Sequence, residues 1–279
     1  MIDIQRIFWN DDGTEKDLSV ELNEWRSGSY TLPFVAADDR LYVACDLPFN
    51  HKYIEIDTAN DQATSVSVET WYGNQWNAVV DLIDRTALSS ASLAQSGIIE
   101  WKTDRLKGWD RELDSDDVSG VSKVGIYDMY WIRMSFSADL NVNTALKYIG
   151  NKFSSDSVLY DYYPDLSNTS LKEAFEAGKT TWDDQHFIAS EMVIRDLKKR
   201  NIIISQNQIL DYEKFKEPTI HKVAEIVYWA LGRQFDDNRT KARAYYDEAI
   251  NLKFFGVDLN RDGNQSDREK STQTGYLRR

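Results

Sequence analysis

The chain has 279 residues, of which 42% are hydrophobic and 28% are charged, and its formal net charge is −13 at pH 7. This length and composition exclude a compositionally disordered chain and leave room for two domains, each with its own core. The acidity disfavours sequence-specific nucleic-acid binding, because affinity for phosphates depends on clustered Lys and Arg. There is no apolar run of about 18 residues and no signal-peptide pattern, so we expect neither a membrane span nor export.

The composition changes near residue 150. Residues 1–150 carry 13 basic and 25 acidic side chains, a net charge of −12, whereas residues 151–279 carry 20 and 21, a net charge of −1. Seven of the nine tryptophans lie in the first part, in runs that alternate in polarity: Trp9, Trp25, Trp71, Trp76, Trp101, Trp109 and Trp131. We therefore predict an α+β protein with an N-terminal antiparallel β-sandwich domain over residues 1–150 and a C-terminal small α-helical bundle over residues 151–279.

Seven short segments of the first part have strand-like alternation. They are Thr31–Val35, Arg40–Leu47, Lys52–Asp57, Val66–Tyr72, Gln75–Leu82, Ile98–Lys102 and Val124–Ser137. The dipeptide Gly73-Asn74 joins two of them and, with Gly first, predicts a type II′ hairpin. The segment 110–120 reads as an acidic loop.

The junction between the parts is expected at residues 138–168, and helical periodicity follows Pro164. Helices are predicted at about 169–177, 180–200, 219–232 and 239–254. Gly232 is well placed to end the third helix. The residues expected to face a core are Ile220, Val223, Ala224, Val227, Tyr228 and Leu231 in the third helix, and Ala242, Tyr245, Tyr246, Ala249 and Ile250 in the fourth.

The strongest chemical motif is the segment 258–269, which satisfies the pattern of an EF-hand calcium loop at every specified position. Ca²⁺ prefers oxygen ligands, and Gly263 would permit the sharp turn at the sixth position. Gln265 replaces the usual aliphatic residue and only ten residues follow Glu269, so we expect a structural or weak site rather than a sensor. The candidate ligands of this possible Ca²⁺ cofactor are Asp258, Asn260, Asp262, Asn264, Ser266 and Glu269.

Other chemical patterns in the chain are incomplete. Residues 177–181 resemble the end of a phosphate-binding loop, but the position that requires glycine is Glu173, whose charge would repel phosphate. The three histidines, His51, His186 and His221, have no zinc-ligand spacing. The single cysteine, Cys45, is expected to be buried on a strand, which fits folding in a reducing cytoplasm. We therefore expect no catalytic residues, although an acid/base pair among 46 acidic residues cannot be singled out from sequence.

The layout resembles structural proteins of tailed bacteriophages, in particular head-to-tail connector (adaptor or neck) proteins. The stretches that carry the resemblance are Ala189–Asn201 (ASEMVIRDLKKRN), Ile209–Tyr212 and Ile220–Gly232 (IHKVAEIVYWALG) in the helical part, and Trp71–Trp76, Gly97–Trp101 and Tyr130–Arg133 in the β part. The resemblance implies a non-enzymatic virion protein of the neck, assembled in the host cytoplasm. It implies a ring of about twelve copies that docks on the portal protein and contacts other neck or tail proteins.

Two alternatives remain open. The first is a tail or baseplate structural protein. The second is a calcium-stabilised module that binds glycan or protein through exposed tryptophans, for which Trp71, Trp76 and Trp101 are candidates. Core packing is the competing explanation of these tryptophans, because most of the aromatic positions fit strand alternation.

Overall fold

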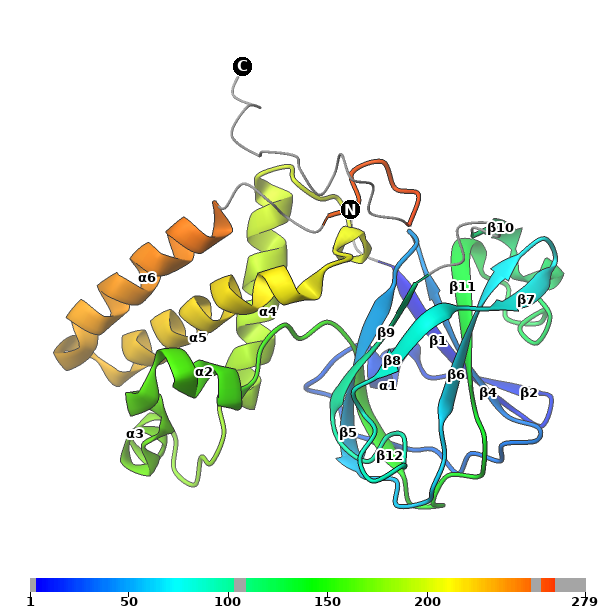
Figure 1. Cartoon of the computed structure of the whole chain (residues 1–279), viewed down its shortest axis with the longest axis horizontal. Coiled ribbons are helices and arrows are strands. Elements are labelled where there is room, and N and C mark those ends of the chain that lie inside the picture. The colour runs from blue at the N-terminus through cyan, green and yellow to red at the C-terminus, as the bar shows by residue number, and fades with distance from the viewer. Residues whose placement is uncertain (1–3, 103–108, 252–256, 264–279) are drawn as a thin grey trace. The chain divides into compact units, whose positions relative to one another are not determined.

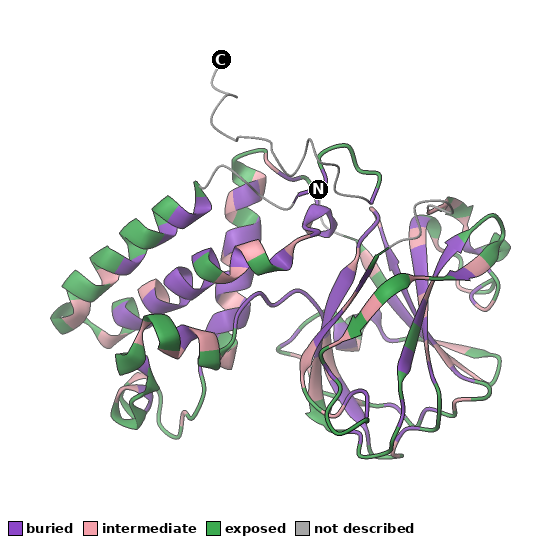
Figure 2. Cartoon of the chain, viewed as in Figure 1, coloured by how far each residue is buried: buried purple, intermediate pink, exposed green. Residues whose placement is uncertain are grey.

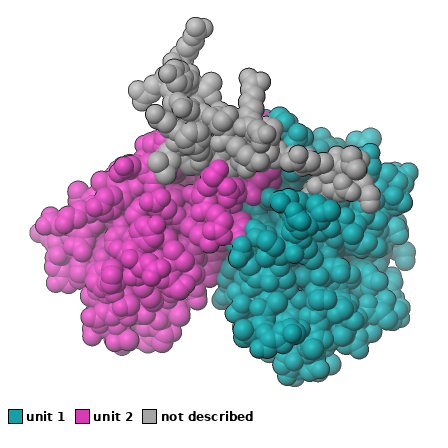
Figure 3. All heavy atoms as spheres, in the orientation of Figure 1, with its two compact units in different colours: residues 1–150, 260–264 teal, residues 151–259, 265–279 magenta. Residues whose placement is uncertain are grey.

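The structure is a computed structural model that describes residues 4–102, 109–251 and 257–263. The chain divides into two compact units, residues 1–150 with 260–264 and residues 151–259 with 265–279 (Figure 3). The first is called the β unit here and the second the helical unit. The β unit contains only short helical segments, and the helical unit contains no strand longer than an isolated bridge among its described residues. The predicted α+β class is confirmed (Figure 1).

The larger sheet of the β unit is antiparallel and has the order β2–β1–β4–β11–β6–β7, with β10 also paired to β11. Its strands are β1 (Gln5–Asp11), β2 (Thr14–Asp17), β4 (Arg40–Cys45), β6 (Val66–Tyr72), β7 (Gln75–Ala78), β10 (Arg111–Asp114) and β11 (Tyr127–Phe136). The second sheet is also antiparallel, with the order β3–β12–β5–β9–β8. Its strands are β3 (Tyr30–Thr31), β5 (His51–Thr58), β8 (Val80–Asp84), β9 (Gly97–Lys102) and β12 (Ala145–Gly150). A single helical turn, α1 (Ser19–Leu22), follows β2 of the larger sheet.

The main core of the β unit lies between the two sheets. Ile7 and Val43 of the larger sheet belong to the same buried cluster as Ile54 and Ile99 of the smaller one. Cys45 belongs to this cluster too, so the prediction of a buried thiol is confirmed. The arrangement is the predicted sandwich, in which inward side chains of both sheets share one core.

The opposite face of the larger sheet is also buried. Phe8 and Trp131, which alternate with the inward residues of their strands, form a second cluster with Val118 and Val121. These valines come from the segment that follows the short 3-10 helix Ser115–Asp117. The predicted acidic loop at 110–120 therefore starts with β10 and then covers apolar surface of the sheet.

Two predictions about turns and strands were wrong in detail. The hairpin at Gly73-Asn74 forms, but both residues have positive φ, 61° and 56°, which is a type I′ turn and not II′. The predicted strand 75–82 is two strands, because the chain passes at Val79 from β7 in one sheet to β8 in the other. The hairpin of β1 and β2 was missed, although Asp12-Gly13 has the same positive φ pair.

The helical unit contains all four predicted helices and one that was not predicted. They are α3 (Thr169–Phe175), α4 (Asp183–Lys199), α5 (Lys216–Leu231) and α6 (Asp236–Ile250), and the additional helix is α2 (Asp156–Tyr162). The expected junction 138–168 was too wide, since it holds both β12 and α2. Gly232 ends α5 with a φ of 93°, as predicted.

The core of the helical unit is centred on α5, whose predicted apolar stripe is buried except for the half-buried Leu231. Trp182, just before α4, and Tyr228 fill the same cluster. The outer face of α6 is largely exposed (Figure 2). Tyr245 lies on that exposed side, so its prediction as a core residue was wrong.

Candidate functional site

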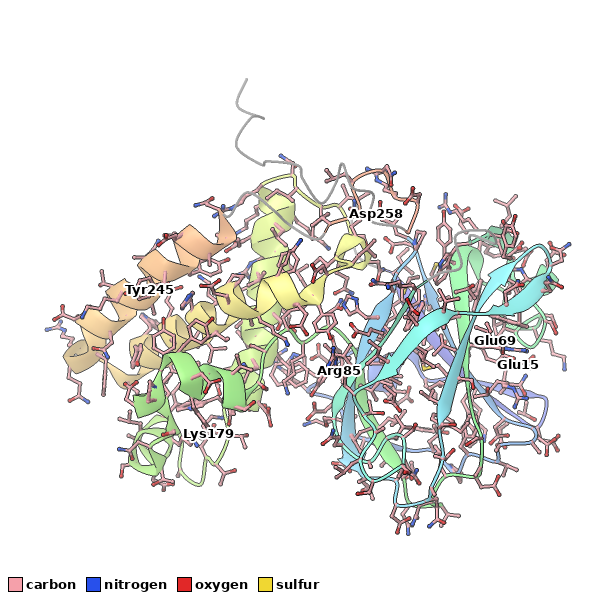
Figure 4. All side chains as sticks on the ribbon, viewed as in Figure 1. Glu15, Glu69, Arg85, Lys179, Tyr245 and Asp258 are labelled. Carbon is pink, nitrogen blue, oxygen red and sulfur yellow. The ribbon has the colours of Figure 1, made fainter. Side chains whose placement is uncertain are left out.

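The first half of the candidate calcium loop lies within the described residues. Asp258, labelled in Figure 4, is almost fully buried, and its backbone is held by Gln208. The Asp258 N–H donates to the Gln208 carbonyl at 2.8 Å, and the Gln208 Nε2 donates to the Asp258 carbonyl at 2.7 Å. A β-bridge between Ile209 and Val257 adjoins this pair. The loop therefore begins from a fixed backbone position.

The next two candidate ligands, Asn260 and Asp262, are hydrogen-bonded to each other. The Asp262 N–H donates to Asn260 Oδ1 at 3.2 Å, and Asn260 Nδ2 donates to Asp262 Oδ2 at 3.0 Å. Gly263 has a φ of 77°, and a Cβ there would come within 2.6 Å of Pro48 Cβ, so glycine is required by both conformation and space. This turn has the sharp bend that a calcium loop needs at its sixth position.

The calcium site remains a prediction. Asn264, Ser266 and Glu269 lie outside the described residues. Asp258 belongs to the helical unit, whereas Asn260 and Asp262 belong to the β unit. Within the described ranges, no three His, Cys, Asp or Glu side chains gather closely enough to hold a metal ion.

Residues 177–181, which resemble the end of a phosphate-binding loop, interact with carboxylates of the protein itself. The Gly178 N–H donates to Glu173 Oε2 at 2.8 Å, and Lys179 Nζ lies 3.4 Å from Glu176 and 3.8 Å from Asp184 (Figure 4). A shallow depression of about 750 Å³ adjoins this loop. Since the groups that would bind an anion already have anionic partners, the geometry agrees with the rejection of a phosphate site.

A Ser–His–Asp chain of hydrogen bonds links the start of the helical unit to α4. Ser154 Oγ lies 2.6 Å from His186 Nδ1, and His186 Nε2 lies 3.1 Å from Asp156 Oδ1. Asp156 also accepts from the Trp182 N–H at 3.1 Å and from the Tyr160 hydroxyl at 2.8 Å. No local sequence motif marks this network, because its members are up to 32 residues apart in the chain.

This network is closed to substrates. The His186 side chain is fully buried, and Ser154 is almost fully buried as well. Burial lowers the pKa of His186, and hydrogen bonding to Asp156 offsets this only partly, so the imidazole is held neutral. Burial acts to raise the pKa of Asp156, but the hydrogen bonds from His186, Tyr160 and the Trp182 N–H outweigh it and lower that pKa. The arrangement fastens α2 to the start of α4 rather than exposing a nucleophile.

A second histidine, the buried His221, lies among tyrosines of the helical unit. The Tyr163 hydroxyl lies 2.8 Å from His221 Nδ1, and the rings of Tyr162 and Tyr245 are centred 5.7 and 5.4 Å from the imidazole. Tyr162 and Tyr245 are about half exposed. Trp229 of α5, which is 69% exposed, is a further exposed aromatic side chain of the helical unit.

The tryptophans proposed as a glycan platform are mostly internal. Trp71 and Trp101 are buried, which contradicts their assignment to an exposed platform. Trp76 is half-buried, and its Nε1 donates to the Ser119 carbonyl at 3.0 Å. The Trp71 Nε1 likewise donates to Glu112 Oε1 at 2.7 Å. The core-packing interpretation therefore holds for Trp71 and Trp101.

No family model, curated protein or solved structure matches this chain. Among the described residues, none of the helices has both the length and the apolar character needed to cross a membrane.

Proposed function

We propose that this chain is a structural protein of a tailed-phage virion, a head-to-tail connector or adaptor of the neck. It would be located in the virion after assembly in the host cytoplasm, and it would contact the portal protein, other neck or tail proteins and further copies of itself. The observation that carries the proposal is the exposure of three large aromatic side chains on the helical unit, those of Tyr162, Trp229 and Tyr245.

These side chains lie on the helical part of the chain, one of the two parts whose stretches carry the resemblance to connectors. The stretch 189–201 falls mainly in α4, and the stretch 220–232 is α5 with its terminal Gly232. The two exposed tyrosines contact the same imidazole, that of His221, so they occupy one side of the unit. Aromatic side chains are enriched at protein interfaces, where they bury large areas with little loss of side-chain freedom.

Two of the chemical groups singled out above are used for structure. His186 is fully buried within its hydrogen-bond network, and the Gly178 N–H donates to the Glu173 carboxylate. Both observations support a non-enzymatic role, in which the protein contributes surfaces and stability rather than a reaction. A possible Ca²⁺ at residues 258–269 would then stabilise the chain.

The test is particle association. An antibody to the purified protein is used to follow it through sedimentation of a lysate of its source. We expect the protein to travel with large particles. A purely soluble protein would contradict the proposal and favour the calcium-stabilised binding module, which glycan-dependent quenching of tryptophan fluorescence would then examine.

A further inference from the structure

One end of the helical unit combines an exposed tryptophan with basic side chains. The helices α5 and α6 are antiparallel, since residues 221 and 222 contact residues 245 and 246 while a short turn joins 231 to 236. The segment 229–243, called the helical tip here, therefore forms the closed end. It has four basic and two acidic side chains, 4 − 2 = +2. They are Arg233, Arg239, Lys241 and Arg243 against Asp236 and Asp237.

The β unit has a surface of opposite charge. The segment 110–128, called the acidic arm here, holds six acidic and two basic side chains, 2 − 6 = −4. Leu113 in β10 is 74% exposed, and Tyr127 at the start of β11 is 65% exposed. Asp116 and Asp117 are exposed beside them in the chain. Asp114 is the register partner of Tyr127, so Leu113 and Tyr127 project from opposite faces of the β10–β11 pair. Leaving a large apolar side chain such as Leu113 in water is unfavourable.

The acidic arm packs against the larger sheet of its own unit and is hydrogen-bonded to it. Val118 and Val121 are buried against the larger sheet, Glu112 accepts from the Trp71 indole, and the Asp114 side chain accepts from the Asp116 N–H at 3.1 Å. A surface held in one conformation loses less entropy when it binds a partner. Its exposed apolar residues are therefore presented by a rigid support.

We propose that the acidic arm of one copy docks on the helical tip of a second copy. Trp229, the most exposed aromatic side chain of the described residues, would be buried against Leu113, and the charges of −4 and +2 would steer the two surfaces together. The two surfaces differ, so the contact is head-to-tail and can close into a ring. This inference deepens the proposed function and rests on it only for the assembly in which the contact would operate.

The proposal is tested with two charge-reversed variants of the full chain. The arm variant carries Asp116→Lys and Asp117→Lys, which change the net charge of the arm from −4 to −4 + 4 = 0. The tip variant carries Arg233→Glu and Lys241→Glu, which change the net charge of the tip from +2 to 2 − 4 = −2. Sedimentation velocity at low salt should show concentration-dependent association of the wild type and monomers for either variant alone. An equimolar mixture should associate again into pairs, because the unchanged acidic arm of the tip variant meets the unchanged basic tip of the arm variant.

A further variant and a control complete the test. Trp229→Ala should weaken association by about 30-fold or more, the effect of losing a hot-spot side chain worth about 2 kcal/mol. Val20→Ser, at an exposed apolar residue of α1 outside both surfaces, should leave association unchanged. The proposal is overturned by a wild type that stays monomeric at all concentrations, or by a mixture that fails to associate.

The test separates the contact from the proposed function. If the protein sediments with particles but the charge reversals do not change self-association, only the contact is wrong. If the reversals control self-association but the protein is absent from particles, the contact stands and the virion role is wrong.

Discussion

Replacing Asp156 by Asn should strongly destabilise the helical unit. The carboxylate accepts three different donors, the Trp182 N–H, the Tyr160 hydroxyl and His186 Nε2. An amide has one oxygen and no charge, so its NH₂ group must face at least one donor. Hydrogen bonds to charged groups contribute about 1.5 to 3 kcal/mol each, and a buried network is sensitive to the loss of one member, so we expect a loss of about 3 kcal/mol.

The assay is urea unfolding followed by far-UV circular dichroism, which reports mainly on the helices. With a slope of about 2 kcal/mol/M, the loss corresponds to a midpoint lower by about 1.5 M. Asp161→Asn is the matched control, because Asp161 is exposed on the same helix and should change stability by less than about 0.5 kcal/mol. A variant Asp156→Asn that unfolds at the wild-type midpoint would refute the structural role of the network.

The same pair of groups gives the stability a defined pH dependence. The pKa of His186 is lowered in the folded state, so the unfolded chain binds a proton first and stability falls as the pH drops below about 6.5. The pKa of Asp156 is also lowered, and its contribution is present above about 3.9 and is lost as the pH falls through the folded value. Asp156→Asn should remove the loss of stability that occurs below a pH of about 3.9, and it should retain the loss that His186 causes below about 6.5. Equal acid sensitivity of both proteins below pH of about 4 would contradict this.

Two further changes test other parts of the structure. Gly97→Ala should destabilise the β unit by about 2 kcal/mol in urea unfolding, because a Cβ there would overlap the backbone carbonyl of Arg85, whereas Gly28→Ala meets no atom and should be nearly neutral. Equal midpoints for the two variants would show that β9 can shift freely. Millimolar Ca²⁺ should raise the melting temperature if residues 258–269 bind it in the native state, and Mg²⁺ at the same concentration should do so less; no shift with Ca²⁺ would remove the calcium site.

The sequence predicted the helices of the second part better than the strands of the first. In α5 the apolar positions recur with helical spacing, and residues such as Val223 and Val227 do face the core. Strand β1 was missed because Ile7, Phe8 and Trp9 are all buried, the first and third between the sheets and the second on the opposite face. A strand that is covered on both faces has no alternation of polarity to detect.

In the candidate site, too, features made of neighbouring residues could be predicted from the sequence, and contacts between distant residues could not. The calcium-loop pattern is contiguous in sequence, so it could be found without the structure. The network of Ser154, Asp156 and His186 and the contact of Tyr163 with His221 join residues that only the fold brings together. The short helix α2 was missed for a related reason, because it is only seven residues long and buries a single side chain, Leu159.

The most direct test of the account is the copy number of the protein in purified particles. Quantitative immunoblotting against a standard of the pure protein gives this number once particle concentration is known. A neck ring predicts about a dozen copies per particle, the closed symmetric assembly that the resemblance implies. Several-fold more or fewer copies would move the protein to another position in the virion, such as the tail or baseplate, and no copies would contradict a virion role.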